Sequence, residues 1–136
     1  MIYTVFMKPS IFTMIIRGEV PCHKVYEDDR IIAFMDIHPI QPGHVLVVPK
    51  LQIDQFQDLP EVDYTALWSV VKKIANKQKQ VLKRSRVGIH VVGVDIPHAH
   101  VHVFPFDTME EYRTKVDKSI PPNHEELSAI AKKLSV

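Results

Sequence analysis

Three histidines alternate with apolar residues in one short stretch of the chain: His98, His100 and His102. Successive side chains of a strand point to opposite faces. A strand here would therefore place the three imidazoles on one face, about 7 Å apart, with the residues between them facing the core. A single histidine in a sheet is most often an ordinary structural residue. Three in register, behind a turn that runs from Gly93 to Pro97, indicate a chemical role instead.

Two kinds of chemistry can use such a row of imidazoles. Neutral imidazoles at alternate strand positions can converge on one metal ion, but no cysteine pair accompanies them, and the acidic residues Asp107, Glu110 and Glu111 follow the strand. Alternatively, a neutral ring nitrogen attacks phosphorus while neighbouring imidazoles donate hydrogen bonds to the phosphate oxygens. The sequence contains no P-loop. The first interpretation predicts stoichiometric zinc or copper, and the second predicts nucleotidyl or phosphoryl transfer.

The segments that must position these histidines are separated by prolines and glycines. Residues 11–17 are expected to form a short helix, with Ser10 as its N-cap and Gly18 at the left-handed position that ends it. β-branched and aromatic residues on both sides of the polar stretch 27–29 predict a β-hairpin. The apolar run 45–48, which is followed by a proline, predicts a buried strand.

The second half of the chain contains the longest helical pattern. Apolar residues recur at three- and four-residue steps over 63–82 and predict the main helix. Segments 86–94 and 99–106 are predicted to be strands. Thr108 and Asn123 are each followed three residues later by a glutamate, as in capping boxes, so the tail is expected to carry two short helices. This order predicts an α+β fold with a mostly antiparallel sheet of about five strands, one main helix and a helical C-terminal tail.

Length and composition exclude several classes of protein. The chain has 136 residues, near the ~150 typical of one domain, and its 46% hydrophobic and 24% charged residues are typical of a globular protein. Seventeen Lys and Arg against sixteen Asp and Glu give a net charge of +1, which favours neither nucleic acid nor an acidic membrane as the partner. Apolar runs such as 45–48 are far shorter than the roughly 20 residues of a membrane span.

Cysteine usage and the start of the chain give two further expectations. Cys22 is the only cysteine, so no internal disulfide can form, which fits a reducing compartment and predicts a cytoplasmic location. The apolar segment 1–7 lacks the basic start and the small-residue cleavage site of a signal peptide, and we expect a strand or an arm of the domain there.

Four blocks of sequence accompany the histidines; they are residues 15–21, 23–29, 33–37 and 42–50. Together with the His-x-His-x-His motif and the apolar residues after it, these blocks resemble the histidine triad (HIT) family of nucleotide-binding proteins in order and spacing. The resemblance covers about residues 10–106. It implies one HIT domain over residues 1–136, with residues 107–136 as a helical tail.

The resemblance also implies a chemistry. HIT proteins are homodimers that bind nucleotides in a cleft beside the triad and hydrolyse or transfer at the α-phosphorus through a nucleotidyl-histidine intermediate. By position, His100 would be the nucleophile, and His98 and His102 would contact phosphate oxygens or orient it. The carbonyl of His98 would hold the ring of His100 in its reactive tautomer. The expected substrate is a purine nucleoside monophosphate joined to an amine, acyl or nucleotide leaving group, with no cofactor.

The residues expected to bind the substrate follow from the same resemblance. Asp36 matches the carboxylate that accepts hydrogen bonds from the ribose hydroxyls, Phe34 and Ile37 would wall the base pocket, and His44 would lie close to the triad. Alternatively, Phe34 and Ile37 are plain core residues and Asp36 caps a turn. Asp95 lies in the turn before the triad, where it would repel a phosphate unless it hydrogen-bonds a histidine.

The sequence also departs from the family pattern. Some HIT proteins carry structural zinc on two cysteines, a histidine and one triad histidine, but the first two positions here look like Ser10 and Thr13, and Gln52 or a neighbour stands at the third. Hydroxyl and amide oxygens are poor zinc ligands, so no zinc is expected. Phe106 stands where the family has an arginine, which keeps open a second interpretation, a nucleotide-binding or interaction module with little turnover. Three other histidines show no partner in the sequence: His23, His90 and His124.

Overall fold

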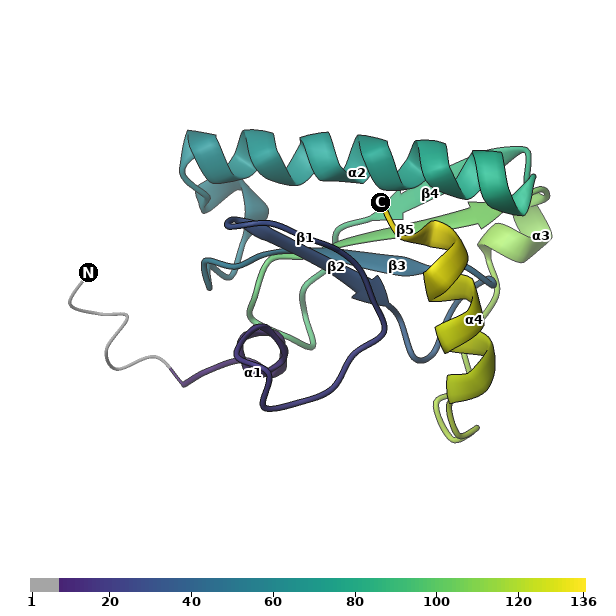
Figure 1. The fold of residues 1–136 in the computed structure, drawn as a ribbon, viewed down its shortest axis with the longest axis horizontal. Helices are drawn as coiled ribbons and strands as arrows, with labels where there is room; N and C mark the ends of the chain where they lie inside the picture. Colours follow the sequence, from purple (N-terminus) through teal and green to yellow (C-terminus); the bar gives the residue numbers. More distant parts are fainter. Residues whose placement is uncertain (1–7) are drawn as a thin grey trace.

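The computed structural model describes residues 8–136, so the strand or arm predicted for residues 1–7 lies outside the described residues. Five antiparallel strands form one sheet in the order β1-β2-β3-β5-β4 (Figure 1). The strands are β1 (Lys24–Glu27), β2 (Ile31–Met35), β3 (Val45–Pro49), β4 (Arg86–His90) and β5 (Val101–Phe106). The helices are α1 (Ile11–Ile16), the 3-10 turn η2 (Phe56–Asp58), α2 (Glu61–Leu82), α3 (Met109–Tyr112) and α4 (His124–Leu134). The α+β class and the antiparallel sheet are confirmed.

Helices cover both faces of the central strands β2 and β3. Alternate residues of a strand point to opposite faces, and here α2 lies over one face and α1 over the other (Figure 1). The residues facing α2 are Ile31, Ala33, Met35, Val45 and Val47. The residues that pack with Phe12 of α1 are Ile32, Phe34, Leu46 and Val48. Because both faces are buried, the two strands have continuous apolar sequences rather than alternating ones.

The long helix α2 is the one that the apolar spacing predicts, beginning two residues earlier, at Glu61. Glu61 and Asp63 are acidic residues in the first turn, where the helix dipole favours negative charge. Lys83 has a left-handed backbone conformation (φ 56°) and ends the helix. The buried stripe consists of Asp63, Leu67, Val70, Val71, Ile74 and Gln78.

The two strands next to the triad are shorter than predicted. β4 ends at His90 and β5 begins at Val101, instead of the predicted residues 94 and 99. The backbone N–H of Ala99 donates to the carbonyl of Ile53 at 2.7 Å and not to a neighbouring strand. This contact holds the chain before β5 against the segment that follows β3. As a result, two of the three triad histidines precede the strand instead of lying on it.

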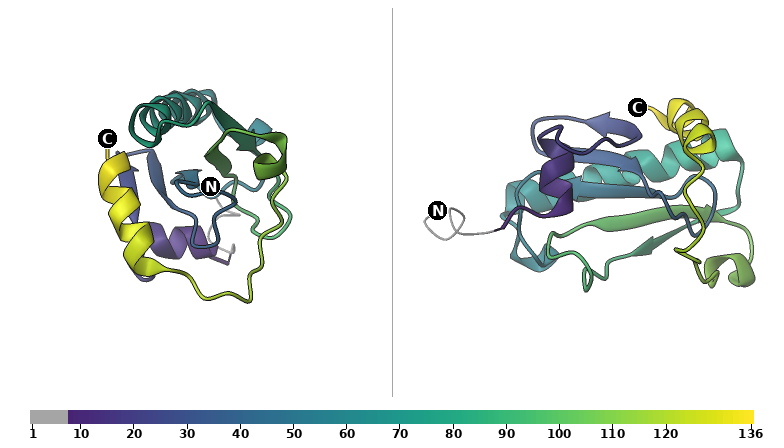
Figure 2. Two further views of the ribbon diagram at one scale, coloured as in Figure 1. Left: turned by 90° about the vertical axis from the view of Figure 1, so that its right-hand side faces the viewer. Right: turned by 90° about the horizontal axis from the view of Figure 1, so that it is seen from below.

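Both predicted caps of the tail helices are present. The Thr108 side chain accepts from the N–H of Glu111, whose carboxylate accepts in return from the N–H of Thr108, as in a capping box. The Asn123 side chain accepts from an N–H in the first turn of α4. At the end of the chain, the N–H of Val136 donates to the carbonyl of Val25 at 3.0 Å, so α4 lies beside β1 of its own chain (Figure 2).

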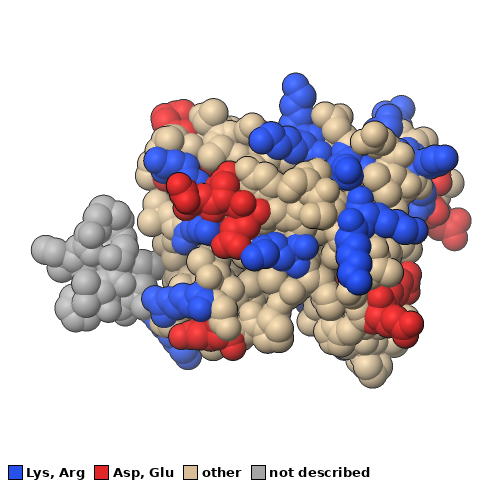
Figure 3. All heavy atoms as spheres, viewed as in Figure 1, with Lys and Arg blue, Asp and Glu red and all other residues tan. Residues whose placement is uncertain are grey.

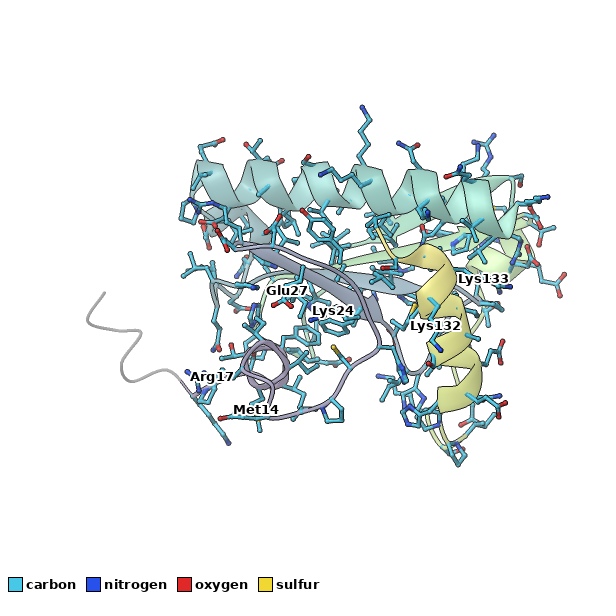
Figure 4. The ribbon with its side chains drawn as sticks, in the orientation of Figure 1. Met14, Arg17, Lys24, Glu27, Lys132 and Lys133 are labelled. Carbon is cyan, nitrogen blue, oxygen red and sulfur yellow. The ribbon has the colours of Figure 1, made fainter. Side chains whose placement is uncertain are left out.

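Charged side chains of both signs are interspersed on the face shown in Figure 3. On this face Lys24 and Glu27 of β1 form an ion pair at 2.6 Å, and the last turn of α4 carries Lys132 and Lys133, where the helix dipole favours positive charge (Figure 4). None of the helices formed by residues 8–136 combines the length and apolar character that crossing a bilayer requires.

Candidate active site

His100 is held as a neutral imidazole, and none of the residues 8–136 makes a hydrogen bond to its Nε2. Its Nδ1 lies 2.7 Å from the carbonyl oxygen of His98. A carbonyl only accepts hydrogen bonds, so Nδ1 carries the proton and Nε2 keeps its lone pair. Burial lowers the pKa of His100 below its ordinary value, although the His98 carbonyl and the charges of Asp36 and Asp95 act in the opposite direction. The ring is therefore neutral at pH 7, the state that a nucleophile needs.

His98 lies in the interior, with none of its surface exposed. Its Nε2–H donates to the carbonyl of Pro49 at 2.7 Å, and its Nδ1 lies 2.6 Å from the hydroxyl of Ser10. His98 lies on the predicted face, since Phe12 of α1 contacts both its ring and that of His100, while the apolar residues that alternate with the triad pack on the α2 side. The α1 segment covers the ring of His98, however, so His98 is not on an open surface. His98 has no free nitrogen for a phosphate oxygen, and of the two predicted roles only the orienting one remains open to it.

His102 lies at the end of a hydrogen-bond relay that begins on the backbone. The N–H of Ile40 donates to Nδ1 of His44 at 3.0 Å, so the proton of His44 is on Nε2. That Nε2–H donates to Nδ1 of His102 at 3.0 Å, which in turn places the proton of His102 on its own Nε2. Burial, with the neighbouring histidines, lowers the pKa of His44 to about 3 and that of His102 to about 4. Both rings are neutral at pH 7.

Asp36 completes a group of three possible metal ligands with His44 and His102, whose ligand atoms all lie within 4.8 Å of one another. The Asp36 Oδ2 is 3.6 Å from Nε2 of His44 and 3.8 Å from Nδ1 of His102. A metal ion would need the lone pair of His44 Nε2, but the N–H of Ile40 keeps the proton on that nitrogen. The group is therefore built as a hydrogen-bond relay rather than as a metal site. The other oxygen, Oδ1, accepts from the N–H of His38 at 2.8 Å.

The remaining predicted substrate-binding residues occupy different surroundings. Phe34 is 3% exposed, and its ring lies edge-on to that of Phe12 of α1, with the centroids 5.6 Å apart. Ile37 is exposed after β2 and lines a cavity of about 390 Å³ between this loop and the C-terminal tail, a cavity that the triad histidines do not line. Asp95 is exposed and lies 3.9 Å from Nζ of Lys118; among the described residues no hydrogen bond joins it to a histidine.

The comparisons with known proteins agree with the sequence motif. A protein-family model described as the HIT domain matches residues 17–109. The chain belongs to the HIT family. The histidine triad of this HIT protein is thus His98, His100 and His102, of which the structure brings His100 and His102 together, with ring centroids 5.0 Å apart.

Relatives of this HIT protein include one with a described activity. An adenylylsulfatase of Arabidopsis thaliana is 34% identical over 100 residues, which are 70% of this chain and 51% of that protein, so the chain spans about half of that relative. A solved HIT-like protein of Bartonella henselae, described as involved in cell-cycle regulation, has a TM-score of 0.79 and 32% identity, covering 92% of this chain and 93% of that one. A zinc-bound histidine triad protein of Mycobacterium smegmatis has a TM-score of 0.73 and 26% identity, covering 91% and 94%.

The structural zinc of some HIT proteins does not fit the residues of this chain. The resemblance implies that Ser10, Thr13 and Gln52 correspond to zinc-ligand positions, and the structure brings these three together with His98. Three of them offer neutral hydroxyl or amide oxygens, and thiolate and imidazole are the ligands that zinc prefers. The Gln52 Oε1 already accepts from the Thr13 hydroxyl at 2.6 Å and from the Ser10 N–H at 2.9 Å. We name these four residues the Ser10 cluster.

Gln78 is a positioning residue that the sequence analysis missed. Its side chain is fully buried under the sheet, and its Nε2 donates to the carbonyls of Gly43 and Val103, each at 2.9 Å. It thereby joins α2 to the residue before His44 and to the strand that carries His102. Gly43 has φ +95°, a left-handed backbone conformation that glycine adopts without strain, and a Cβ there would also press on the Leu82 side chain. The sequence did contain a signal for Gln78, because it is a polar amide residue at a position where the spacing of α2 predicts a buried apolar one.

The three histidines without a visible partner do have partners in the structure. Nε2 of His90 lies 2.9 Å from the hydroxyl of Tyr112, which joins the end of β4 to α3. Nε2 of His23 lies 2.9 Å from Nδ1 of His124, at the start of α4. Both contacts join residues far apart in the sequence, so the sequence carried no local signal for them.

The buried histidines make the folded protein less stable below pH 6.5. His44 and His102 stay neutral in the folded state down to about pH 3 and pH 4, whereas in the unfolded chain they bind a proton near pH 6.5. Their stabilisation is therefore complete above pH 6.5 and is lost as the pH falls, by about 1.4 kcal/mol per pH unit for each proton. The lowered pKa values of His98 and His100 act in the same direction. Asp36, whose pKa is raised by burial, acts against it.

Urea unfolding between pH 7.5 and 5 measures this effect, since most carboxylates remain ionised in that range. The unfolding midpoint is expected to fall steadily below pH 6.5, and calorimetry is expected to show proton uptake on unfolding at pH 5.5. A variant of the surface pair, His23→Gln, serves as the control and should keep the same slope. A midpoint that does not change over this range would contradict the neutral state of the buried histidines.

Proposed function

We propose that this HIT protein is a nucleotide hydrolase or phosphoramidase that cleaves at the α-phosphorus of a purine nucleoside monophosphate ester or amide, through a nucleotidyl intermediate on His100. The observation that carries this proposal is the 2.7 Å hydrogen bond from Nδ1–H of His100 to the carbonyl of His98. It supports a neutral ring whose Nε2 lone pair is available for attack.

The reaction proceeds in two displacements. In the first, the Nε2 lone pair of His100 forms a bond to phosphorus, the bond from phosphorus to the leaving group breaks, and the leaving group takes the bonding electrons and a proton from water. The ring then carries a positive charge, and its hydrogen bond to the His98 carbonyl strengthens. In the second, a water molecule attacks phosphorus and loses a proton, and the electrons of the P–N bond return to His100. The products are the nucleoside monophosphate and the free leaving group.

The other predicted site residues have supporting roles. The Nε2–H of His102 donates to an oxygen of the phosphate and stabilises the charge that develops there. Asp36, which is mostly buried and beside the relay, accepts from the ribose hydroxyls, and the carboxylate can accept from more than one donor. Ile37, which is exposed directly after Asp36, walls the base pocket, whereas Phe34 packs in the core under α1 and supports that wall from behind.

The substrate is a small nucleotide rather than a nucleic acid. The net charge of +1 and the interspersed charges of Figure 3 support this, because no single-sign field is available for a polyanion. The activity of the Arabidopsis relative makes adenylyl sulfate a sensible second test substrate beside adenosine 5′-phosphoramidate. The one cysteine supports a reducing compartment, and we propose the cytoplasm.

We also propose that the protein is a homodimer that pairs along β4. β4 is an edge strand of the sheet, and apolar residues on and after it are exposed: Ile89, Val91 and Val92. Light scattering is expected to give about twice the 15.7 kDa of one chain. Ile89→Lys should shift the mass towards one chain, and the control Val62→Lys, on the exposed side of α2, should not. A wild type of single-chain mass at micromolar concentration would contradict the dimer.

The proposed activity is tested by intact-protein mass spectrometry after rapid quenching, without acid, of wild type and His100→Ala mixed with adenosine 5′-phosphoramidate or adenylyl sulfate. An AMP-sized mass gain on wild type alone is expected. If wild type binds AMP in a titration but forms no adduct and releases no AMP, the chain is a nucleotide-binding module instead. Zinc or copper in stoichiometric amount, by elemental analysis, would favour the metalloprotein interpretation.

A further inference from the structure

We infer that the Ser10 cluster is a metal-independent device that positions His100, acting through His98, and that Ser10 is its central residue. The inference rests on the proposed nucleophilic role of His100. It adds three positioning residues that come from α1, its N-cap and the loop after β3: Ser10, Thr13 and Gln52.

The first step is that short hydrogen bonds join the members of the cluster. The amide oxygen of Gln52 accepts from the Ser10 N–H at 2.9 Å and from the Thr13 hydroxyl at 2.6 Å. The Gln52 amide nitrogen donates to the carbonyl of Lys8 at 2.9 Å. The Ser10 Oγ accepts from the N–H of Thr13 at 3.0 Å, as the N-cap of α1. The hydroxyl of Ser10 lies 3.3 Å from Oγ1 of Thr13 and 2.6 Å from Nδ1 of His98, and the shorter contact places its proton toward His98.

The second step is that His98 has no freedom left. Its Nε2–H donates to the carbonyl of Pro49, so its Nδ1 is an acceptor, and the Ser10 hydroxyl lies 2.6 Å from it. The ring is fixed at both nitrogens, between the N-cap of α1 and the end of β3. The backbone of the same residue supplies the carbonyl that accepts from His100. A shift of this ring would therefore move the acceptor that sets the tautomer of His100.

The third step is that α1 also contacts the nucleophile directly. The ring of Phe12 lies edge-on to His98 and to His100, with centroid distances of 5.8 Å and 4.8 Å. Phe12 is two residues after Ser10 on the helix that Ser10 caps. The cluster thus fixes both the carbonyl behind His100 and the aromatic ring beside it.

The resemblance implies that zinc would join these segments in some HIT proteins, whereas in this chain hydrogen bonds join them. Because its lone pairs already accept hydrogen bonds, a cation would have to break several of them to enter. The wild-type protein should accordingly need no metal. The variant Ser10→Cys/Thr13→Cys/Gln52→His, which restores two thiolates and an imidazole, should bind about one zinc ion per chain.

Three variants separate positioning from folding. Ser10→Ala removes both the N-cap and the hydroxyl that faces His98, and Ser10→Thr keeps both. Asn123→Ala removes the N-cap of α4, a helix that packs on α2, β1 and β2 and, among residues 8–136, makes no hydrogen bond to the Ser10 cluster, and is the matched control for the loss of a cap. We expect Ser10→Ala to lower kcat for adenosine 5′-phosphoramidate by about 30-fold with KM changed less than about threefold, since an interaction that orients the nucleophile affects the transition state. Ser10→Thr should restore kcat to within about threefold.

Nitrogen NMR of the histidine side chains gives a readout that does not depend on turnover. In wild type, His100 is expected to show one protonated Nδ1 and one free Nε2, and in Ser10→Ala a mixture of both tautomers. Asn123→Ala should lower the melting temperature by a similar amount without changing kcat or these signals. If Ser10→Ala lowers only the melting temperature, the cluster is merely structural and the inference is wrong.

The two proposals fail in distinguishable ways. If wild type forms no adduct and releases no AMP, the hydrolase proposal fails, but the tautomer signals still test the cluster. If wild type is active and loses activity on dialysis against a chelator, regaining it with zinc, the cluster is not metal-independent. If the cysteine and histidine triple variant binds no zinc while remaining folded by circular dichroism, the four positions do not have the geometry that we assign to them.

Discussion

Replacing His100 by glycine is expected to lower kcat/KM for adenosine 5′-phosphoramidate by about 10³- to 10⁵-fold, because the two-step route loses its nucleophile. Binding of AMP should change by less than about threefold, since the ribose and base contacts belong to other residues. The ring of His100 is mostly buried, so glycine leaves a space of imidazole size. Initial rates over a range of substrate concentrations and calorimetric titration with AMP measure the two quantities.

The space left by His100→Gly offers a positive control. Added imidazole is expected to restore part of the activity, because it can occupy the same site and carry the nucleotidyl group to solution. His23→Gln, at an exposed histidine pair, is the matched substitution and should retain wild-type kcat/KM. A glycine variant with more than about a tenth of the wild-type kcat/KM would show that water attacks phosphorus directly, and the covalent route through His100 would be wrong.

The parts of the fold that the sequence predicts well depend on local signals. The caps at Ser10, Thr108 and Asn123 involve residues three apart in the sequence, and each is present. The long helix follows from the spacing of its apolar residues, and continuous apolar runs mark β2 and β3. In all of these, the residues that decide the structure lie within a few positions of one another.

The details of the candidate site depend on contacts between distant parts of the chain. Alternation predicts that Ala99, Val101 and Val103 face the core, and all three are buried. The burial of His98 was not predictable, because its ring lies against Phe12 and against Ser10, which is 88 residues earlier in the chain. No periodic pattern contains a contact of that kind.

The protonation pattern of the triad is likewise set by tertiary contacts. Sequence comparison suggested that the carbonyl of His98 orients His100, and the structure places the two in contact. It gave no indication that Ile40 determines the tautomer of His102 through His44, because backbone N–H groups are the same in every residue. The sequence therefore indicated which residues gather at the site, but not which of their nitrogens carry protons.

That difference in protonation leads to a prediction for His102. The ring of His100 presents a lone pair, whereas the ring of His102 presents an N–H, because the Nε2–H of His44 occupies its other nitrogen. Since burial lowers the pKa of His102 to about 4, the ring is neutral at pH 7 and acts as a hydrogen-bond donor, not as a source of protons. His102→Ala is expected to lower kcat by about 10²- to 10³-fold, the usual effect of removing one donor to a developing negative charge.

A change of leaving group distinguishes the two roles of His102. If His102 donates to a phosphate oxygen that is not part of the leaving group, its effect does not depend on which leaving group departs. The fall in kcat in His102→Ala should therefore be the same, within about threefold, for the phosphoramidate and for the 4-nitrophenyl ester of AMP. His102→Gln, whose amide N–H can take the place of Nε2–H, should recover about tenfold of the loss with both substrates. If His102→Ala cleaves the nitrophenyl ester at the wild-type rate and fails only with the phosphoramidate, then His102 protonates the leaving group. In that case the relay from Ile40 through His44 must be broken when substrate binds, because a ring must first be protonated on both nitrogens, as a cation, to give up a proton and become neutral.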